Sequence, residues 1–210
     1  MYYVPMDDSI TPQSELVFLL HGIGANRWMM HTLAKRLTKS GYDVNNWGYA
    51  STWGSIEDHS RRLAKALQAA DNDPSITTIH IVAHSMGSIV TRHALAQFRP
   101  RKLRRVVLLG PPNRGSPWAS VFGPWLRLLC RPIDQLAARS GSFVNELGPF
   151  DAVEFGVIAA GHDILVPLAS THLAGQRDHR IVPCMHSMLL FREDVATMIR
   201  SFLAHGTFTP

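Results

Sequence analysis

The sequence has few cysteines and no long apolar run. Its two cysteines, Cys130 and Cys184, are too few for a disulfide framework in 210 residues, and we expect two buried thiols, with a single disulfide as the alternative. No apolar stretch reaches the roughly 18 residues of a membrane-spanning helix. Residues 1–15 contain no basic residue and no long apolar core, unlike a secretory signal peptide. We therefore expect a cytoplasmic protein.

Motifs for metals, nucleotides and nucleic acids are also missing. The sequence contains no H-E-x-x-H, no C-x-x-C and no acidic loop of the calcium type. It contains neither G-x-x-x-x-G-K-[ST] nor G-x-G-x-x-G, and no recognition-helix or RNP-like pattern. We therefore expect no metal, no cofactor and no nucleic-acid partner.

Positive charge exceeds negative charge, with 21 Lys+Arg against 16 Asp+Glu and a net charge of +5. A basic cluster lies at 99–105, and its five members are Arg99, Arg101, Lys102, Arg104 and Arg105. We interpret it as a solvated turn between a helix and a strand, with an anionic surface as the alternative partner. The cluster and the tryptophans are compatible with transient contact with a membrane surface. No pattern indicates the oligomeric state.

Short apolar runs alternate with helical patterns along the whole chain. We expect strands at 16–20, 42–49, 78–83, 106–109, 155–160 and 180–182, and helices at 55–70, 86–98 and 194–204. Strands buried on both faces and separated by helices indicate a mostly parallel sheet with helices on both faces. With no repeat and no linker, the chain is expected to form one α/β domain, residues 1–210, with about six strands.

A proline-rich stretch at 111–150 interrupts this alternation. It encloses the aromatic and aliphatic segment 118–130, and it is longer than a connection between two strands requires. We expect a small cap of one or two short helices that forms the wall of a substrate pocket. The alternative is an ordinary crossover helix packed on the sheet.

The most informative motif is Ala-His-Ser-Met-Gly at 83–87, which follows an apolar strand and begins a helix. This is the nucleophile-elbow pattern G-x-S-x-G with Ala83 in place of the first glycine. Small residues are needed two positions before and after the serine because the turn is sharp. The turn lifts Ser85 Oγ out of the sheet and places the Met86 N–H where it can face a developing oxyanion. The alternative role of Ser85 is a simple helix N-cap.

A second glycine-rich turn, Leu20-His21-Gly22-Ile23-Gly24, ends the first expected strand. Its two glycines let the backbone turn tightly and approach a ligand. Together with the serine elbow it predicts the Ile23 N–H as the second oxyanion donor. His21 is expected to order this loop by hydrogen bonding rather than to transfer a proton.

An acid and a histidine should follow the serine in the chain. Asp163 lies just past the strand at 155–160, and His186 follows the last short strand. We therefore expect both residues at the carboxyl ends of the strands, where Ser85 also lies. The other acids weighed were Asp178, in a polar run, and Asp151, which precedes its strand. The other histidines weighed were His162, His172 and His179. An Asx-turn is the alternative role for Asp163.

These motifs resemble those of the α/β-hydrolase superfamily, in particular its small bacterial lipase/esterase-like members. HGIGAN at 21–26 is similar to the family's oxyanion loop, and AHSMG to an elbow with alanine first. LGPPNRGS at 109–116, GHDILVP at 161–167 and CMHSML at 184–189 resemble the stretches that follow later strands. The resemblance implies a minimal α/β-hydrolase fold with a short cap and a Ser85–Asp163–His186 triad with Ile23 and Met86 as oxyanion donors.

The expected activity is hydrolysis of carboxylic esters through an acyl-enzyme on Ser85. Four aromatic residues are candidates for an apolar acyl pocket: Trp28, Trp118, Phe122 and Trp125. Enzyme alternatives are a thioesterase, an amidase or an acyltransferase of the same fold. An alternative of another class is a non-catalytic binding module, for which an intact triad would be unnecessary.

Overall fold

A computed structural model describes residues 14–126, 130–139, 141–151 and 153–209, without the side chains of 122–124 and 126. Its centre is a six-stranded parallel sheet in the order β2-β1-β3-β4-β5-β6. The strands are β1 (Ser14–Leu20), β2 (Asp43–Trp47), β3 (Ile76–His84), β4 (Leu103–Leu109), β5 (Glu154–Ala160) and β6 (Asp178–Val182). The predicted α/β class and the six predicted strands are confirmed.

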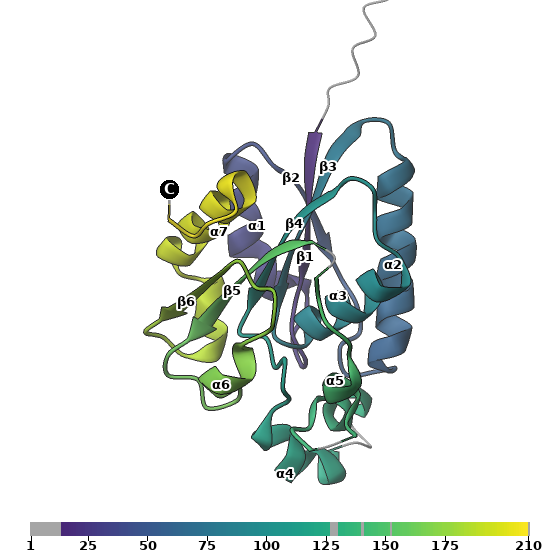
Figure 1. Cartoon of the computed structure of the whole chain (residues 1–210), viewed down its shortest axis with the longest axis vertical. Helices are drawn as coiled ribbons and strands as arrows, with labels where there is room; N and C mark the ends of the chain where they lie inside the picture. The colour runs from purple at the N-terminus through teal and green to yellow at the C-terminus, as the bar shows by residue number, and fades with distance from the viewer. Residues whose placement is uncertain (1–13, 127–129, 140, 152, 210) are drawn as a thin grey trace, which may run out of the picture.

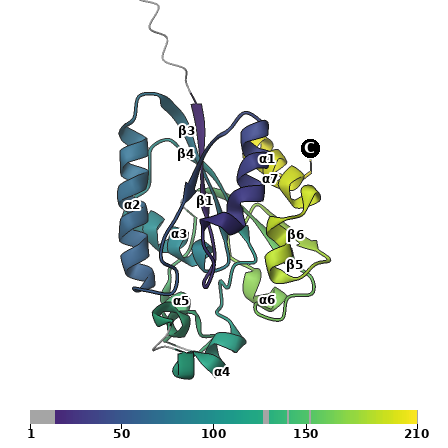
Figure 2. The same cartoon turned by 180° about the vertical axis from the view of Figure 1, so that it is seen from behind.

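Helices cover both faces of the sheet (Figures 1 and 2). One face carries α1 (His31–Lys39) and α7 (Glu193–His205), and the other carries α2 (Ile56–Asn72) and α3 (Met86–Gln97). The predicted helices at 55–70, 86–98 and 194–204 correspond to α2, α3 and α7. No helix was predicted at the position of α1.

Side chains of the strands alternate between the two helical layers, as the two-residue period of a strand requires. Phe18 and Leu20 of β1 pack in the core under α2 and α3, whereas Val17 and Leu19 pack under α1 and α7. All four side chains are buried. Continuous apolar runs are therefore needed in the sequence, because both faces of each central strand exclude water.

The long connection between β4 and β5 lies beyond the carboxyl ends of the strands (Figure 1). It contains α4 (Pro117–Leu126), the 3-10 helix η2 (Arg131–Leu136) and α5 (Phe143–Glu146). The remaining short elements are η1 (Arg27–Met30), α6 (Leu168–Thr171) and η3 (His186–Leu190). None of the described helices has both the length and the apolar character to cross a membrane. The two cysteine thiols are unpaired.

The basic cluster at 99–105 is not the fully solvated turn that we expected. Arg105 is buried, its guanidinium lies 2.9 Å from Glu154, and it donates to the Leu203 and Ala204 carbonyls at the end of α7. A cation there satisfies carbonyls that lack intrahelical donors. Arg101 similarly pairs with the buried Asp71 at 3.0 Å. Arg101 and Arg105 therefore make structural contacts near the amino end of β4.

The imidazole of His80 in β3 is fully buried, and neither ring nitrogen makes a hydrogen bond among the described residues. The nearest carboxylate oxygen, from the partly exposed Glu15, lies 3.6 Å from Nε2. Burial, reinforced by the positive charges of Arg105 and Arg104, lowers the pKa of His80 to about 4. The neutral ring is thus the form compatible with the folded state.

We predict that His80 makes the protein less stable as the pH falls from about 6.5 to about 4. In that window the unfolded chain binds a proton on His80 and the folded chain does not, at about 1.4 kcal/mol per pH unit. His80→Phe should flatten this dependence by up to one proton, measured by urea unfolding at several pH values. Above pH 7 the free energies of unfolding of the two proteins should depend on pH in the same way. Equal slopes between pH 4 and pH 6.5 would contradict the prediction.

Gly87 lets the amino end of α3 lie directly against the end of β1. A Cβ atom at position 87 would lie 2.7 Å from the His21 carbonyl oxygen and 3.0 Å from Leu20 Cβ. Real Cβ atoms do not approach backbone so closely, so a larger side chain would push α3 away from β1. This contact fixes the distance between the two turns that the sequence singles out.

We predict that Gly87→Ala lowers the free energy of unfolding by about 1–3 kcal/mol, because the added methyl overpacks a rigid contact. Gly148→Ala is the matched control, since a Cβ at position 148 meets no atom within 4 Å. Urea unfolding of both variants measures the difference. Equal losses from the two substitutions would show that the α3–β1 contact is not tight.

Candidate active site

Ser85 stands at the sharp turn between β3 and α3. Its φ of 53° and ψ of −125° make it the one non-glycine residue with positive φ in the described part of the chain. Its amide donates to the Leu109 carbonyl at 2.8 Å, which anchors the turn to β4. Such a backbone costs about 1–3 kcal/mol and persists where its surroundings fix it. The geometry is therefore that of a strained elbow rather than an ordinary N-cap.

Two other glycines allow neighbouring chain segments to close around this turn. A Cβ at Gly22 would lie 2.9 Å from Ser85 Cβ, so the loop after β1 lies directly beside the serine. Gly110 follows β4 with a φ of 52°, and a Cβ there would lie 3.0 Å from the His186 ring. The turns after β1, β3 and β4 thus converge on one point.

The loop after β1 is held in place from behind by side chains. His21 Nδ1 lies 2.9 Å from the Gly22 oxygen and donates to it, since a carbonyl can only accept. That carbonyl belongs to the same planar trans peptide as the Ile23 N–H, so fixing one orients the other. The Tyr49 hydroxyl donates to the His21 carbonyl at 2.6 Å, and Ser51 donates to the Ala25 carbonyl at 2.9 Å.

Tyr49 is a buried member of a stack of rings. Its ring centroid lies 4.3 Å from that of His21 and 4.8 Å from that of His59. Burial raises the pKa of the Tyr49 phenol, so the hydroxyl stays protonated as a donor. Sequence analysis did not single out Tyr49 or Ser51, because a side chain that binds a distant carbonyl leaves no local pattern.

The Met86 amide is the first of α3 and has no acceptor within its own helix. The Met86 side chain is buried under the helix, which leaves the backbone as its contribution to the site. Ser88, one turn on, donates to the Ala83 carbonyl at 3.0 Å and ties the helix back to β3. The backbone amides at 23 and 86 are thus both provided by turns next to Ser85.

Asp163 and His186 form a buried pair. Asp163 Oδ2 lies 2.5 Å from His186 Nδ1, and both side chains are less than one-tenth exposed. Asp163 Oδ1 accepts from the Leu165 and Val166 amides, each at 2.9 Å. The carboxylate therefore makes an Asx-type turn with one oxygen and orients the imidazole with the other, so the two roles weighed for it coexist.

Burial alone would raise the pKa of Asp163. The hydrogen bond and charge of His186, together with the amides of Val166 and Leu165, outweigh burial and hold the pKa below its usual value. Asp163 is therefore ionised at neutral pH, and its Oδ2 is an acceptor for the His186 Nδ1–H.

The His84 ring packs against the His186 ring, with the two ring centroids 4.7 Å apart. His84 Nε2 also lies 3.3 Å from the His186 carbonyl oxygen. Burial lowers the pKa of His84 to about 3, with a further contribution from His186. A neutral imidazole thus supports His186 without competing for its proton. The elbow motif contains His84, but only the fold shows that its ring reaches His186.

The other acids and histidines that the sequence offered lie elsewhere. Asp178 accepts from the Phe208 amide near the C-terminus, and Asp151 is exposed before β5. His179 lies 3.0 Å from the Thr171 hydroxyl and stacks on His172 at 4.1 Å. His162 is the one rival on the same loop as Asp163.

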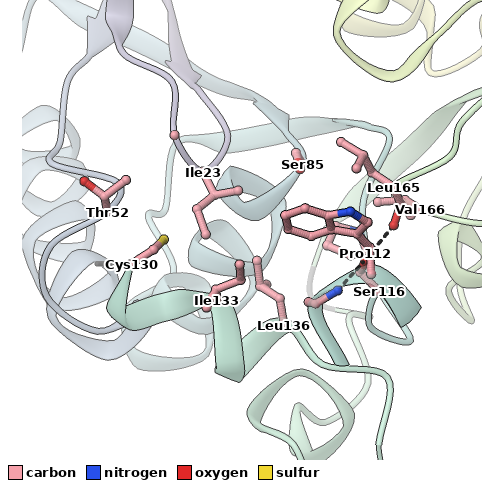
Figure 3. Close-up of a pocket in the computed structure, with 13 residues that line it drawn as sticks. Ile23, Thr52, Ser85, Pro112, Ser116, Cys130, Ile133, Leu136, Leu165 and Val166 are labelled. Carbon is pink, nitrogen blue, oxygen red and sulfur yellow. Dashed lines mark hydrogen bonds between the residues drawn. The ribbon is translucent and has the colours of Figure 1, made fainter. Parts of the chain in front are cut away.

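Ser85 opens into an apolar pocket of about 460 Å³, hereafter the acyl pocket (Figure 3). Figure 3 shows Ile23 and Leu165 on opposite sides of Ser85, with Ile133 and Leu136 of η2 facing the serine across the pocket. The other lining residues are Gly24, Thr52, Pro112, Ser116, Trp118, Ala119, Cys130 and Val166. Ser116 Oγ donates to the Leu165 carbonyl at 2.5 Å, so this hydroxyl is already used within the protein.

The four aromatic residues expected around the substrate are placed differently from one another. Trp118 lines the acyl pocket. Trp28 and Trp125 are 68% and 84% exposed and are absent from its lining. The side chain of Phe122 lies outside the described part of the structure. The wall is otherwise largely aliphatic, with contributions from η2 and from the loop at 163–166.

Among the described residues, no three His, Cys, Asp or Glu side chains are arranged to hold a metal ion. The described groups are a carboxylate that orients an imidazole, a serine hydroxyl at a strained turn and two backbone amides next to that turn.

This chain resembles known proteins more in fold than in sequence. A search of the curated proteins found no significant match. Among solved structures, Aspergillus fumigatus lipase B superimposes with a TM-score of 0.76 at 14% identity, over 92% of this chain and 53% of that one. The chain thus spans about half the length of that lipase.

Two further structures match over most of their own length. The mature Bacillus licheniformis lipase has a TM-score of 0.67 at 15% identity, covering 97% of this chain and 96% of that chain. An esterase of Pyrococcus furiosus has a TM-score of 0.62 at 18% identity, covering 91% and 83%. At such identities these likenesses show the fold.

A family model for the alpha/beta hydrolase fold matches residues 15–146, more than half of the chain. That range begins in β1 and includes the loop after it, the Ser85 turn and most of the connection between β4 and β5. By sequence as well as by fold, this chain is a member of the alpha/beta hydrolase family.

Proposed function

We propose that this hydrolase cleaves neutral carboxylic esters through an acyl-enzyme on Ser85. The observation that carries the proposal is the strained backbone of Ser85 in the wall of an apolar pocket. The Ser85 amide donates to the Leu109 carbonyl, and the next residue, Gly110, lies against the imidazole of the Asp163–His186 pair. Strained serines of this kind expose a nucleophile at the carboxyl edge of a parallel sheet. The relatives named as lipases and esterases agree with this reaction class.

In the proposed reaction, His186 Nε2 removes the Ser85 proton as Oγ attacks the ester carbonyl carbon. The carbonyl oxygen gains the negative charge and is stabilised by the Ile23 and Met86 amides. Asp163 keeps the proton of the neutral imidazole on Nδ1 and stabilises the imidazolium. The C–O bond to the alcohol then breaks, and the alcohol leaves with the proton from Nε2. Water repeats the sequence on the acyl-enzyme.

The acyl pocket favours an uncharged, apolar acyl group. No Lys, Arg, Asp or Glu is among the residues that line it. An acyl carboxylate or phosphate would lose its hydration there without a partner. Residues 111–150, which we propose to be a cap on a single domain, supply much of this wall through Trp118, Ile133 and Leu136.

A thioesterase, an amidase and an acyltransferase use the same intermediate, and ester hydrolysis is preferred because the similar solved structures are named as lipases and an esterase. A non-catalytic binding module would not need Ser85, Asp163 and His186 in one place. Membrane contact is left out of the proposal, because the basic cluster at 99–105 lies where β4 begins, whereas the exposed Trp28 follows the end of β1. These two features are thus at opposite ends of the parallel strands. No metal, cofactor or nucleic acid enters it.

We predict that Tyr49→Phe lowers kcat by up to about a hundredfold with little change in KM. Without the Tyr49 hydroxyl, the peptide before the Ile23 donor loses its anchor, while the acyl pocket is untouched. Steady-state hydrolysis of p-nitrophenyl butyrate measures the effect. Tyr42→Phe is the matched control, since the half-buried Tyr42 faces His80 and lies far from this loop in the fold.

We predict that Ser85→Ala lowers kcat for hydrolysis of p-nitrophenyl butyrate by about 10⁴-fold or more, because the nucleophile is lost. Asp163→Asn should lower kcat by about 10⁴-fold, because the imidazole loses its correct tautomer. A fluorophosphonate probe should label the wild-type protein and not Ser85→Ala. Ser40→Ala, which removes an exposed hydroxyl at the end of α1, should keep full activity and labelling. Turnover or labelling that survives in Ser85→Ala would refute the proposed function.

A further inference from the structure

A second hollow lies beside the first, on the His186 side of the site. It has a volume of about 310 Å³, and we call it the histidine groove. It is lined by His162, Ile164, Leu165, Met185, His186, Ser187 and Met188. Leu165 lines both hollows, whereas Ser85 lines only the acyl pocket and His186 only the groove. The two catalytic groups therefore face two different apolar spaces across one leucine.

The chemistry of ester cleavage assigns these two spaces to different parts of a substrate. Four groups surround the carbon in the tetrahedral intermediate: Ser85 Oγ, the oxyanion, the acyl chain and the alcohol oxygen. The oxyanion faces the amides at 23 and 86, and the acyl chain has the acyl pocket. The alcohol oxygen must lie against His186, because it takes its proton from that imidazole.

We propose that the histidine groove binds the alcohol portion of the ester, and that this alcohol is apolar and uncharged, of the arylalkyl kind such as benzyl alcohol. This inference rests on the proposed function and specifies its substrate class. His186 provides the proton at the inner end of the groove, and Leu165 separates the alcohol from the acyl chain.

The side chains of the groove indicate this class of alcohol. Three apolar side chains of the groove are exposed to solvent: Ile164 at 78%, Met185 at 58% and Met188 at 49%. Adjacent exposed apolar side chains of this size are typical of a binding surface. Methionine sulfur contacts aromatic rings favourably, and its flexible side chain adapts to their shape. No Lys or Arg is among the lining residues, so a phosphorylated leaving group would find no cation there.

The test compares methyl butyrate with benzyl butyrate, which share an acyl group and have leaving alcohols of similar acidity. Both esters form the same acyl-enzyme, so only acylation, and hence kcat/KM, reports the alcohol. The wild-type protein should prefer the benzyl ester by about tenfold. The 4-carboxybenzyl ester, which adds a negative charge, should lose that preference.

Ile164→Ser and Met188→Ser remove apolar surface from the groove without touching the catalytic groups. Each should reduce the benzyl-to-methyl ratio about three- to tenfold, as expected for the loss of a few buried methylenes. Their preference between methyl butyrate and methyl octanoate should not change, because the acyl pocket is intact. Ile181→Ser is the matched control: Ile181 is an exposed isoleucine of β6 that does not line the groove.

The inference is overturned if the groove variants keep the wild-type benzyl-to-methyl ratio, or if the carboxylated ester is cleaved as well as the benzyl ester. In either case the fluorophosphonate label on Ser85 would still support the proposed function. Absence of turnover on every ester together with absence of labelling is a different result: the hydrolase proposal then fails, and the groove has no alcohol to bind.

Discussion

The close approach of three chain turns around Ser85 is the constraint on which the rest of the site depends. A serine with φ of 53° is unfavourable by itself, and it persists because β3 and α3 fix the residues on either side. Gly22, Gly87 and Gly110 let backbone and imidazole approach to distances that a Cβ would prevent. Sheet packing thus supplies the free energy that holds Ser85 in its strained conformation, and the positions of the loop after β1 and of His186 follow from the same contacts.

The sequence predicted the sheet well because the central strands are buried on both faces and must be continuous apolar runs. It missed α1, a helix of nine residues in which Leu33 and Leu37 are the buried positions, too short for a persuasive period. Within the site, residues beside a glycine or at the end of a strand could be predicted from local pattern. Tyr49 and Ser51 could not, because their partners are carbonyls more than 25 positions away.

The pocket wall illustrates a different limit. Aromatic character indicated Trp28 and Trp125, yet the wall is built mainly from aliphatic side chains such as Ile133, Leu136 and Leu165. Which side of a short helix faces the sheet depends on its neighbours, and hydropathy in a connection rich in proline does not contain that information. The charge pattern has the same limit: Arg105 belongs to a basic run in the sequence, whereas in the fold it is a buried side chain paired with the partly exposed Glu154.

An apolar space on each side of the catalytic pair has a consequence for the choice between water and alcohol as acyl acceptor. In the proposed reaction, acylation uses both spaces, whereas the acyl-enzyme leaves the histidine groove vacant beside His186. By microscopic reversibility, an alcohol that leaves well through this groove also re-enters it well and returns the acyl group. Hydrolysis and acyl transfer are therefore not separate functions of separate features: on the proposal made above, their ratio is set by how well Ile164, Met185 and Met188 retain an alcohol against water at the same imidazole.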